Sequence, residues 1–156
     1  MNNGKRLESN FKKSVPNDIF YYRFKDGTAS WDKGSLTRFQ QKNICDCMLF
    51  DGNRLYLIEL KSTKGKSIPF ENFRENQLKE LSMAQYFTNT VAGIVIEFSE
   101  LDRAFFMRIS DITNFIRKGE RKSIPLDYCA EKGIEIEIKK KRVNNSFNIR
   151  KLLEEI

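Results

Sequence analysis

Residues 44–61, ICDCMLFDGNRLYLIELK, contain two apolar runs that are joined by a short polar turn. The Gly52-Asn53 dipeptide between the runs has the composition of a two-residue hairpin loop, because both residue types tolerate the positive φ angles that such loops require. The stretch therefore predicts an antiparallel β-hairpin at the centre of the fold.

The register of this hairpin decides which charged side chains meet. With the Gly52-Asn53 loop, Asp46 lies directly opposite Glu59, whereas a loop one residue earlier would place Asp46 opposite Leu57. Opposed side chains have Cβ atoms about 4.5–5.5 Å apart, where like charges destabilise a sheet. At an effective dielectric constant near 20, two carboxylates ~5 Å apart repel by roughly 3 kcal/mol. In the first register we therefore expect a divalent cation to offset the repulsion.

Lys61 lies two residues beyond Glu59 and so points to the same face of the strand. Two acids and a lysine at one end of a hairpin are typical of a hydrolytic metal site. Opposed carboxylates also arise by chance in water, since about a quarter of the residues of an ordinary domain are charged. Here, however, Asp46 shares its face with the apolar residues Met48 and Phe50. We therefore favour the functional interpretation.

The composition of the chain indicates one globular domain over residues 1–156, long enough to bury a core. Hydrophobic residues make up 40% of the chain, but no run approaches the ~18 apolar residues of a membrane span. The N-terminus lacks the apolar core of a secretory signal. We therefore expect a cytoplasmic protein with no membrane partner.

The net charge of +7 and the pI near 9.3 favour a polyanionic partner, such as DNA, although a generally basic surface would give the same values. Clustered cations near the predicted hairpin, the N-terminus and the polar central segment are the candidates for phosphate contacts. They are Lys5, Arg6, Arg38, Lys42, Lys64 and Lys66.

The absence of histidine excludes His-dependent zinc sites, Ser-His-Asp triads and imidazole bases. Three cysteines, Cys45, Cys47 and Cys129, are too few for a four-cysteine zinc site. Cys45 and Cys47 lie in a predicted strand, where they are expected to pack as small apolar residues. Catalysis would then depend on carboxylates, lysine and a hard cation with oxygen ligands, for which Mg²⁺ is the natural choice.

The N-terminal region predicts a helix over residues 5–14. On a helical wheel Leu7, Phe11 and Val15 fall within one narrow arc. Glu8 lies at the edge of this arc, so we expect its side chain to point toward the core.

A second helix is expected over residues 71–87. Its apolar arc contains Phe73, Leu81 and Ala84, with Gln77 in the middle. A glutamine inside an apolar arc needs a hydrogen-bond partner, which either a backbone group or an acidic site would supply.

The segment 26–43 is polar, with isolated Trp31 and Phe39, and is expected to form an extended hairpin or an arm. Its aromatic side chains would either stack on bases beside Arg38 or attach the loop to the body of the domain.

The other elements follow from apolar runs and their turn residues. Residues 91–98, VAGIVIEF, are apolar apart from Glu97, as expected of a central strand that is covered on both faces. Ser110 is expected to cap a helix that ends before Gly119. The order of elements predicts an α/β domain with a mixed central β-sheet flanked by helices. Further strands are expected at 19–24, 104–109 and 134–138, a basic loop at 62–70 and a short helix at 148–156.

Together, Glu8, Asp46 and the E-x-K of Glu59 and Lys61 form a candidate hydrolytic centre. Two carboxylates and a backbone carbonyl can hold one or two Mg²⁺ ions, which polarise a phosphodiester and lower the pKa of a bound water. Lys61 would orient that water and stabilise the charge of the transition state. The D-x(n)-E-x-K spacing alone is a weak signal, and its place on a hairpin in a basic, histidine-free chain strengthens it.

At these residues the sequence resembles the PD-(D/E)XK nuclease superfamily, and more narrowly the RecU-type Holliday junction resolvases of Gram-positive bacteria and their phages. The segment from Glu59 to Gln77 is the specific part of the resemblance, since E-x-K alone would not distinguish this family from other nucleases. The matching motifs are G-K-R-L-E (4–8), I-C-D (44–46), L-I-E-L-K-S-T-K-G-K-S-I-P-F-E-N-F (57–73) and, more weakly, R-K-S-I (121–124).

The resemblance implies a restriction-endonuclease-like fold and a homodimer that binds four-way junction DNA and nicks two opposed strands symmetrically with Mg²⁺ or Mn²⁺. It also implies that residues 26–43 form a stalk that enters the junction, and that the protein acts in a bacterial cell or a phage-infected host, as a phage-encoded member would. Carried over by position, the catalytic residues are Glu8, Asp46, Glu59, Lys61 and Gln77, and the metal ligands are the three acids.

Two other functions fit the same residues. A restriction- or repair-type nuclease of the same fold would cut linear duplex DNA at defined sequences or ends. A DNA-binding module without catalysis would bind DNA equally well in EDTA, although intact acids and an intact Lys61 argue against a decayed site.

Overall fold

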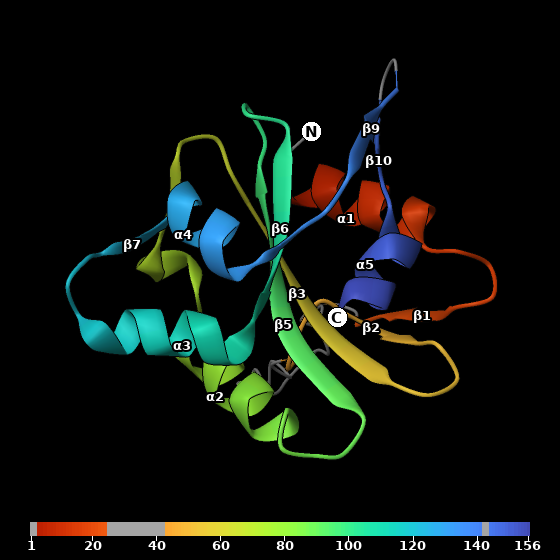
Figure 1. Ribbon diagram of the computed structural model, residues 1–156, viewed down its shortest axis with the longest axis horizontal. Coiled ribbons are helices and arrows are strands. Elements are labelled where there is room, and N and C mark those ends of the chain that lie inside the picture. The colour runs from red at the N-terminus through yellow and green to blue at the C-terminus, as the bar shows by residue number, and fades with distance from the viewer. Residues whose placement is uncertain (1–2, 25–42, 142–143) are drawn as a thin grey trace, which may run out of the picture.

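A six-stranded mixed β-sheet with helices on both faces forms the body of the protein (Figure 1), as the sequence predicted. The computed structural model describes residues 3–24, 43–141 and 144–156. The strand order is β1-β2-β3-β5-β6-β8, in which only β3 and β5 run parallel. These strands span Phe20–Arg23, Cys47–Phe50, Leu55–Thr63, Thr90–Phe98, Arg103–Arg108 and Ile134–Glu135.

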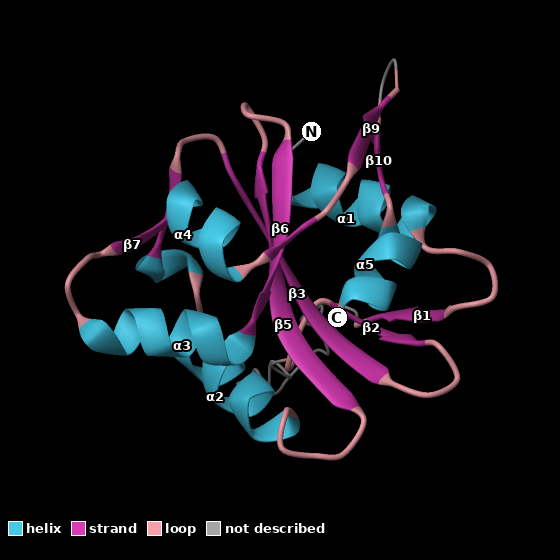
Figure 2. Ribbon diagram, viewed as in Figure 1, coloured by secondary structure: helices cyan, strands magenta, loops and turns pink. Residues whose placement is uncertain are grey.

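The helices cover the two faces of the sheet in separate groups (Figure 2). α1 (Asn3–Ser14) and α5 (Ile149–Glu155) pack on one face, and α2 (Glu75–Ala84), α3 (Ile109–Lys118) and α4 (Leu126–Lys132) pack on the other. Two hydrophobic clusters result. The first joins Leu7, Phe11 and Leu152 to Tyr56, Ile58 and Val95, and the second joins Leu81, Ile112 and Cys129 to Ile94, Ile96 and Phe105.

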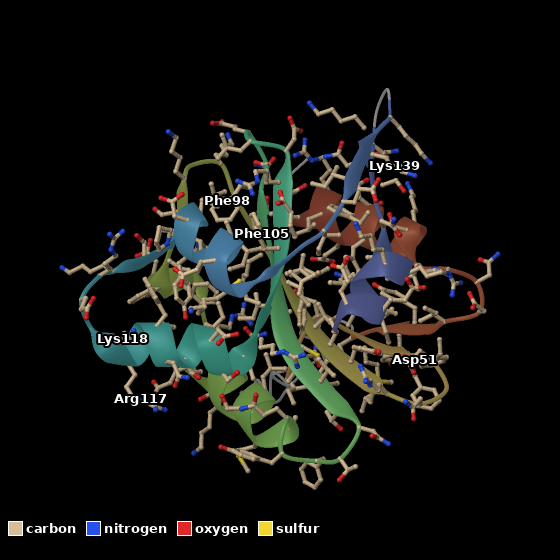
Figure 3. All side chains as sticks on the ribbon, viewed as in Figure 1. Asp51, Phe98, Phe105, Arg117, Lys118 and Lys139 are labelled. Atoms are coloured by element: carbon tan, nitrogen blue, oxygen red, sulfur yellow. The ribbon has the colours of Figure 1, made fainter. Side chains whose placement is uncertain are left out.

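The central strands β3 and β5 are buried on both faces, which explains their nearly continuous apolar sequences. Phe98 of β5 and Phe105 of β6 make an edge-to-face contact at 6.1 Å between ring centroids (Figure 3). Gly93 lies where β5 meets β6. A Cβ atom there would be 2.4 Å from the Phe106 ring and 2.5 Å from the Met107 carbonyl oxygen, so this close packing requires glycine.

The β2–β3 hairpin has the first of the two predicted registers, with Met48 opposite Leu57. The Asp51 N–H donates to the Arg54 carbonyl oxygen at 3.4 Å across the loop, and Gly52 has φ +96°. The Asp51 carboxylate also accepts hydrogen bonds from the N–H groups of Asn53 and Arg54, at 2.8 and 2.7 Å. The alternative loop, one residue earlier, is therefore wrong.

The predicted element boundaries need four corrections. Ser110 lies inside α3, which follows Arg108 without a side-chain cap, although Gly119 does end the helix at φ +69°.

The predicted loop 62–70 is mostly strand and turn, because β3 extends to Thr63 and β4 (Ser67–Pro69) pairs with β7 (Ser123–Pro125). The second helix is shorter than 71–87, and a 3₁₀ turn, Phe70–Asn72, precedes it. The predicted strand 134–138 is split between β8 and β9 (Ile138–Lys140), which pairs with β10 (Asn145–Phe147).

The predicted arm at 26–43 lies outside the described residues, apart from Asn43. In the described parts of the chain, no helix has the length and apolarity that crossing a membrane requires.

Gly93→Ala is expected to destabilise the fold by about 1–3 kcal/mol, because the added methyl group overpacks the β5–β6 contact. Urea unfolding followed by circular dichroism measures the loss. Gly65→Ala is the matched control, since no atom lies within 4 Å of a Cβ at that position. Equal unfolding midpoints for the two variants would show that the β5–β6 packing tolerates the extra volume.

Candidate active site

Asp46 lies immediately before β2, where the paired part of the hairpin ends at Cys47 and Ile58. Its Oδ2 accepts a hydrogen bond from the Leu60 N–H at 2.7 Å, so the carboxylate takes the place of a strand partner. The Phe24 N–H in turn donates to the Asp46 carbonyl oxygen at 2.9 Å. These two bonds fix Asp46 beside the Glu59–Lys61 segment of β3.

Glu59 is buried, with 3% of its surface exposed, and each of its carboxylate oxygens has a donor. Lys61 Nζ donates to Oε1 at 2.6 Å, and Gln77 Nε2 donates to Oε2 at 3.0 Å. Gln77 is itself buried and reaches Glu59 from α2, which covers this face of the sheet. The structure therefore brings Glu59, Lys61 and Gln77 together, with Gln77 bonded to an acidic group and not to the backbone, and their catalytic roles stay predictions.

The two neighbouring acids are in electrostatic conflict. Burial raises the pKa of Asp46, and the negative charge of Glu59 raises it further, from an ordinary value of 3.8 to about 7. The Leu60 N–H and the Lys61 ammonium act in the opposite direction but do not cancel these effects. A cation between the carboxylates would favour the ionised form of Asp46.

Glu8 reaches the same region from the other face of the sheet. Its carboxylate forms a 2.5 Å ion pair with the Arg23 guanidinium of β1, and a quarter of its side chain is exposed. It is close enough to Asp46 that its charge also raises the pKa of that carboxyl group. Arg23 is not among the residues that the sequence predicted for this region. Its place near the site follows from the pairing of β1 with β2, which puts Arg23 opposite Cys47, the residue after Asp46.

The acids do not form a ready-made three-ligand cluster. Across the described ranges, no group of three or more cysteine, aspartate and glutamate side chains is gathered closely enough to hold a metal ion. Mg²⁺, however, commonly binds through one or two carboxylates and keeps several waters or phosphate oxygens as further ligands. The paired charges of Asp46 and Glu59 fit that pattern, and ligation by Glu8 stays a prediction.

The three thiols are unsuited to nucleophilic catalysis. Cys45, Cys47 and Cys129 are all free and buried. Burial raises the pKa of Cys45 and of Cys129 to about 12, so both are protonated at neutral pH.

The predicted DNA-contacting cations differ in their surroundings. Lys5, Lys64 and Lys66 are exposed, and the last two follow β3 directly. Arg6 is only partly exposed, and its Nε atom is buried. Arg38 and Lys42 lie outside the described residues.

The mixed sheet, with helices on both faces and acidic residues at the end of the β2–β3 hairpin, defines a restriction-endonuclease-like domain. Residues 5–149 match the family model described as RecU, Recombination protein U. The chain belongs to this family.

Individual relatives agree with the family match. The SPbeta prophage-derived uncharacterized protein YotM of Bacillus subtilis is 33% identical over 171 residues, which cover 99% of this chain and 87% of that protein. The Holliday junction resolvase RecU of Lactococcus lactis subsp. cremoris is 37% identical over 83 residues, 51% of this chain and 38% of that protein. The prophage origin of YotM fits a phage-encoded member.

Among solved structures, the Holliday junction resolvase Hjc of Archaeoglobus fulgidus is similar, with a TM-score of 0.52. The match covers 85% of this chain and 95% of that chain, at 16% sequence identity. At this identity the structural match supports the assignment of the fold alone.

Gln77→Ala is expected to destabilise the protein by about 1–3 kcal/mol, because it leaves one oxygen of the buried Glu59 carboxylate without a donor. Thermal or urea unfolding measures the change. Asn76→Ala is the control, since Asn76 is an exposed residue of the same helix. Equal stability of the two variants would mean that Gln77 does not compensate Glu59.

The conflict between Asp46 and Glu59 predicts a pH dependence of stability. In EDTA, the free energy of unfolding of the wild type should fall, relative to that of Asp46→Asn, between about pH 4 and pH 7. In this window the folded protein holds a proton on Asp46 that the unfolded chain releases, so raising the pH penalises the folded state. Urea unfolding at several pH values measures the difference.

Asp127→Asn removes an exposed carboxylate and controls for net charge. Saturating Mg²⁺ should reduce the fall in the wild type, because a bound cation favours ionised Asp46. Parallel stability curves for the wild type and Asp46→Asn in EDTA would contradict the electrostatic account.

Proposed function

We propose that the protein is a Mg²⁺-dependent, structure-selective DNA endonuclease that resolves four-way junctions by paired symmetric nicks. The observation that carries the proposal is the contact of Glu59 with Lys61 and Gln77 beside Asp46, in a chain of the RecU family. A bacterial cell or a phage-infected host is the setting that we propose for this activity.

Asp46 and Glu59 would hold Mg²⁺, with Mn²⁺ as a substitute, and Glu8 would add a third acid from α1. When bound, the ion polarises the scissile phosphodiester and lowers the pKa of a coordinated water. The geometry of the chain's own residues supports this assignment, because the Leu60 N–H holds Oδ2 of Asp46 beside the buried carboxylate of Glu59.

Lys61 is proposed to orient the attacking water and to stabilise the negative charge that develops on the phosphate. Its ammonium group lies 2.6 Å from Glu59 Oε1, so it is fixed next to the acids and not free in solvent. Gln77 would keep Glu59 in place by holding its second oxygen. Lys61 of β3 and Gln77 of α2 would thus together compensate the negative charge of Glu59 and hold its carboxylate in place.

Junction binding would depend on backbone charge and on the shape of the DNA, not on base readout. The exposed Lys64 and Lys66 follow the E-x-K segment closely in sequence, which suits contacts to phosphates near the scissile bond. Lys5, Arg38 and Lys42 are further proposed contacts.

A homodimer is part of the proposal, because paired nicks require two active sites. Large apolar side chains are exposed on the edge strand β1 and on its neighbour β2: Phe20 at 55%, Tyr22 at 46% and Phe50 at 43%. Phe20 and Phe50 are cross-strand partners, so they share one face of the sheet. Clustered exposed apolar residues are a common mark of protein interfaces, and a second copy of the chain would cover them.

Cleavage of a labelled synthetic four-way junction, beside a linear duplex of matched sequence, tests the proposal. With Mg²⁺ the wild type should produce paired symmetric nicks in the junction only, and EDTA should abolish them. Glu59→Ala should lower the cleavage rate by at least about a hundredfold while junction binding is retained, because a lost ligand removes stabilisation of the transition state and not of bound DNA.

Glu71→Ala is the control for this assay, since Glu71 is an exposed glutamate outside the site. Cutting of both substrates would indicate a restriction- or repair-type nuclease. Tight junction binding without any metal-dependent cutting would contradict the proposal and leave a DNA-binding module.

A further inference from the structure

A second buried carboxylate lies on the opposite face of the sheet from Glu59. Glu97, near the end of β5, is 1% exposed and shares the face of Val95, which packs in the cluster with α1. The Ser62 hydroxyl donates to Glu97 Oε2 at 2.8 Å. Glu97 Oε1 is buried and has no hydrogen-bond partner among the described residues. A buried carboxylate with one oxygen lacking a donor needs a further group that compensates its negative charge.

Arg6 of α1 lies one helical turn after Asn3, on the side of the helix that meets the end of β5, and its charge acts on Glu97 without a hydrogen bond between the two side chains. Its Nε atom is also buried without a hydrogen-bond partner in the described structure. Burial raises the pKa of Glu97, and the Ser62 hydroxyl and the Arg6 guanidinium both act to lower it. Asn3 Nδ2 donates to Ser99 Oγ at 3.4 Å, which places the start of α1 against the end of β5.

The helix carries Arg6 and Glu8 on different flanks. Two residues correspond to about 200° of rotation around an α-helix. Arg6 therefore lies on the side of α1 that Asn3 holds against the end of β5, whereas Glu8 reaches the Arg23 guanidinium of β1 on the other side. Any interaction that fixes Arg6 also sets the rotation of α1 about its axis, and with it the position of Glu8 beside Asp46.

We propose that Arg6 is a positioning residue, whose guanidinium compensates the buried Glu97–Ser62 pair and thereby holds Glu8 at the active site. This inference rests on the proposed nuclease function. It differs from the sequence-based expectation that Arg6 contacts DNA, and the partial burial of Arg6, with its Nε atom buried, favours a positioning role.

Single-turnover cleavage of the four-way junction by saturating enzyme, together with junction binding at several salt concentrations, tests this role. Arg6→Gln should slow the cleavage step by about tenfold to a hundredfold, because misplacing a site residue by a small distance has effects of this size. The Kd for the junction and its salt dependence should not change. Lys13→Gln is the control, since it removes a positive charge from an exposed side chain of the same helix that is not among the proposed DNA contacts.

Combined substitutions test whether the effect of Arg6 on the cleavage rate depends on Glu8. Arg6→Gln should cause no further loss of rate in a Glu8→Gln background, whereas a general loss of folding would slow both backgrounds equally. Arg6→Lys, which keeps the positive charge, should recover part of the rate. Weaker binding with a shallower salt slope and an unchanged single-turnover rate would identify Arg6 as a phosphate contact and overturn the proposal.

If the wild type does not cut junctions, the proposed function fails, and a separate measurement still tests whether the charge of Arg6 compensates Glu97. A double-mutant cycle of Arg6→Gln and Glu97→Gln, followed by thermal unfolding, should show coupling between the two positions. Additive effects on the melting temperature would overturn the proposed charge compensation itself.

Discussion

The buried charge of Glu59 is the constraint on which the active site depends. A carboxylate in a central strand is strongly disfavoured unless donors surround it, and here Lys61 and Gln77 each donate to one of its oxygens. The donors come from β3 itself and from the helix that covers it. The strand and α2 must therefore keep their relative positions for the charge to remain compensated. Asp46 beside this group leaves an excess of negative charge, which a site for a divalent cation requires.

The rest of the fold brings three separate segments to that charge. The two-residue turn at Gly52 fixes the hairpin register and so sets Asp46 next to β3. The parallel pairing of β3 with β5 buries both strands and excludes water from one side of the site. α1 packs on the opposite face and carries Glu8 toward β1. Asp46 and Glu59 thus lie beside each other where one hairpin strand begins, and Glu8 extends toward them from α1, so no single element determines the site.

Local sequence patterns were sufficient for the hairpin, the central strand and the inward position of Gln77, because turn chemistry and apolar periodicity act over a few residues. They were insufficient for Ser110, since its hydroxyl does not cap the helix and α3 begins directly after β6. The small β4–β7 pair and the split of the predicted strand at 134–138 depend on partners distant in the sequence. The same applies to Arg23 and Arg6, whose environments are set by the packing of α1 against the sheet.

We propose that a divalent cation binds at the excess negative charge of Asp46 and Glu59. The most direct measurement is a crystal structure of the protein soaked in Mn²⁺, with anomalous scattering used to locate the ion. The account predicts one strong anomalous peak in contact with the carboxylates of both Asp46 and Glu59, and its loss in Asp46→Asn crystals. A peak elsewhere, or the same peak in the variant, would contradict it.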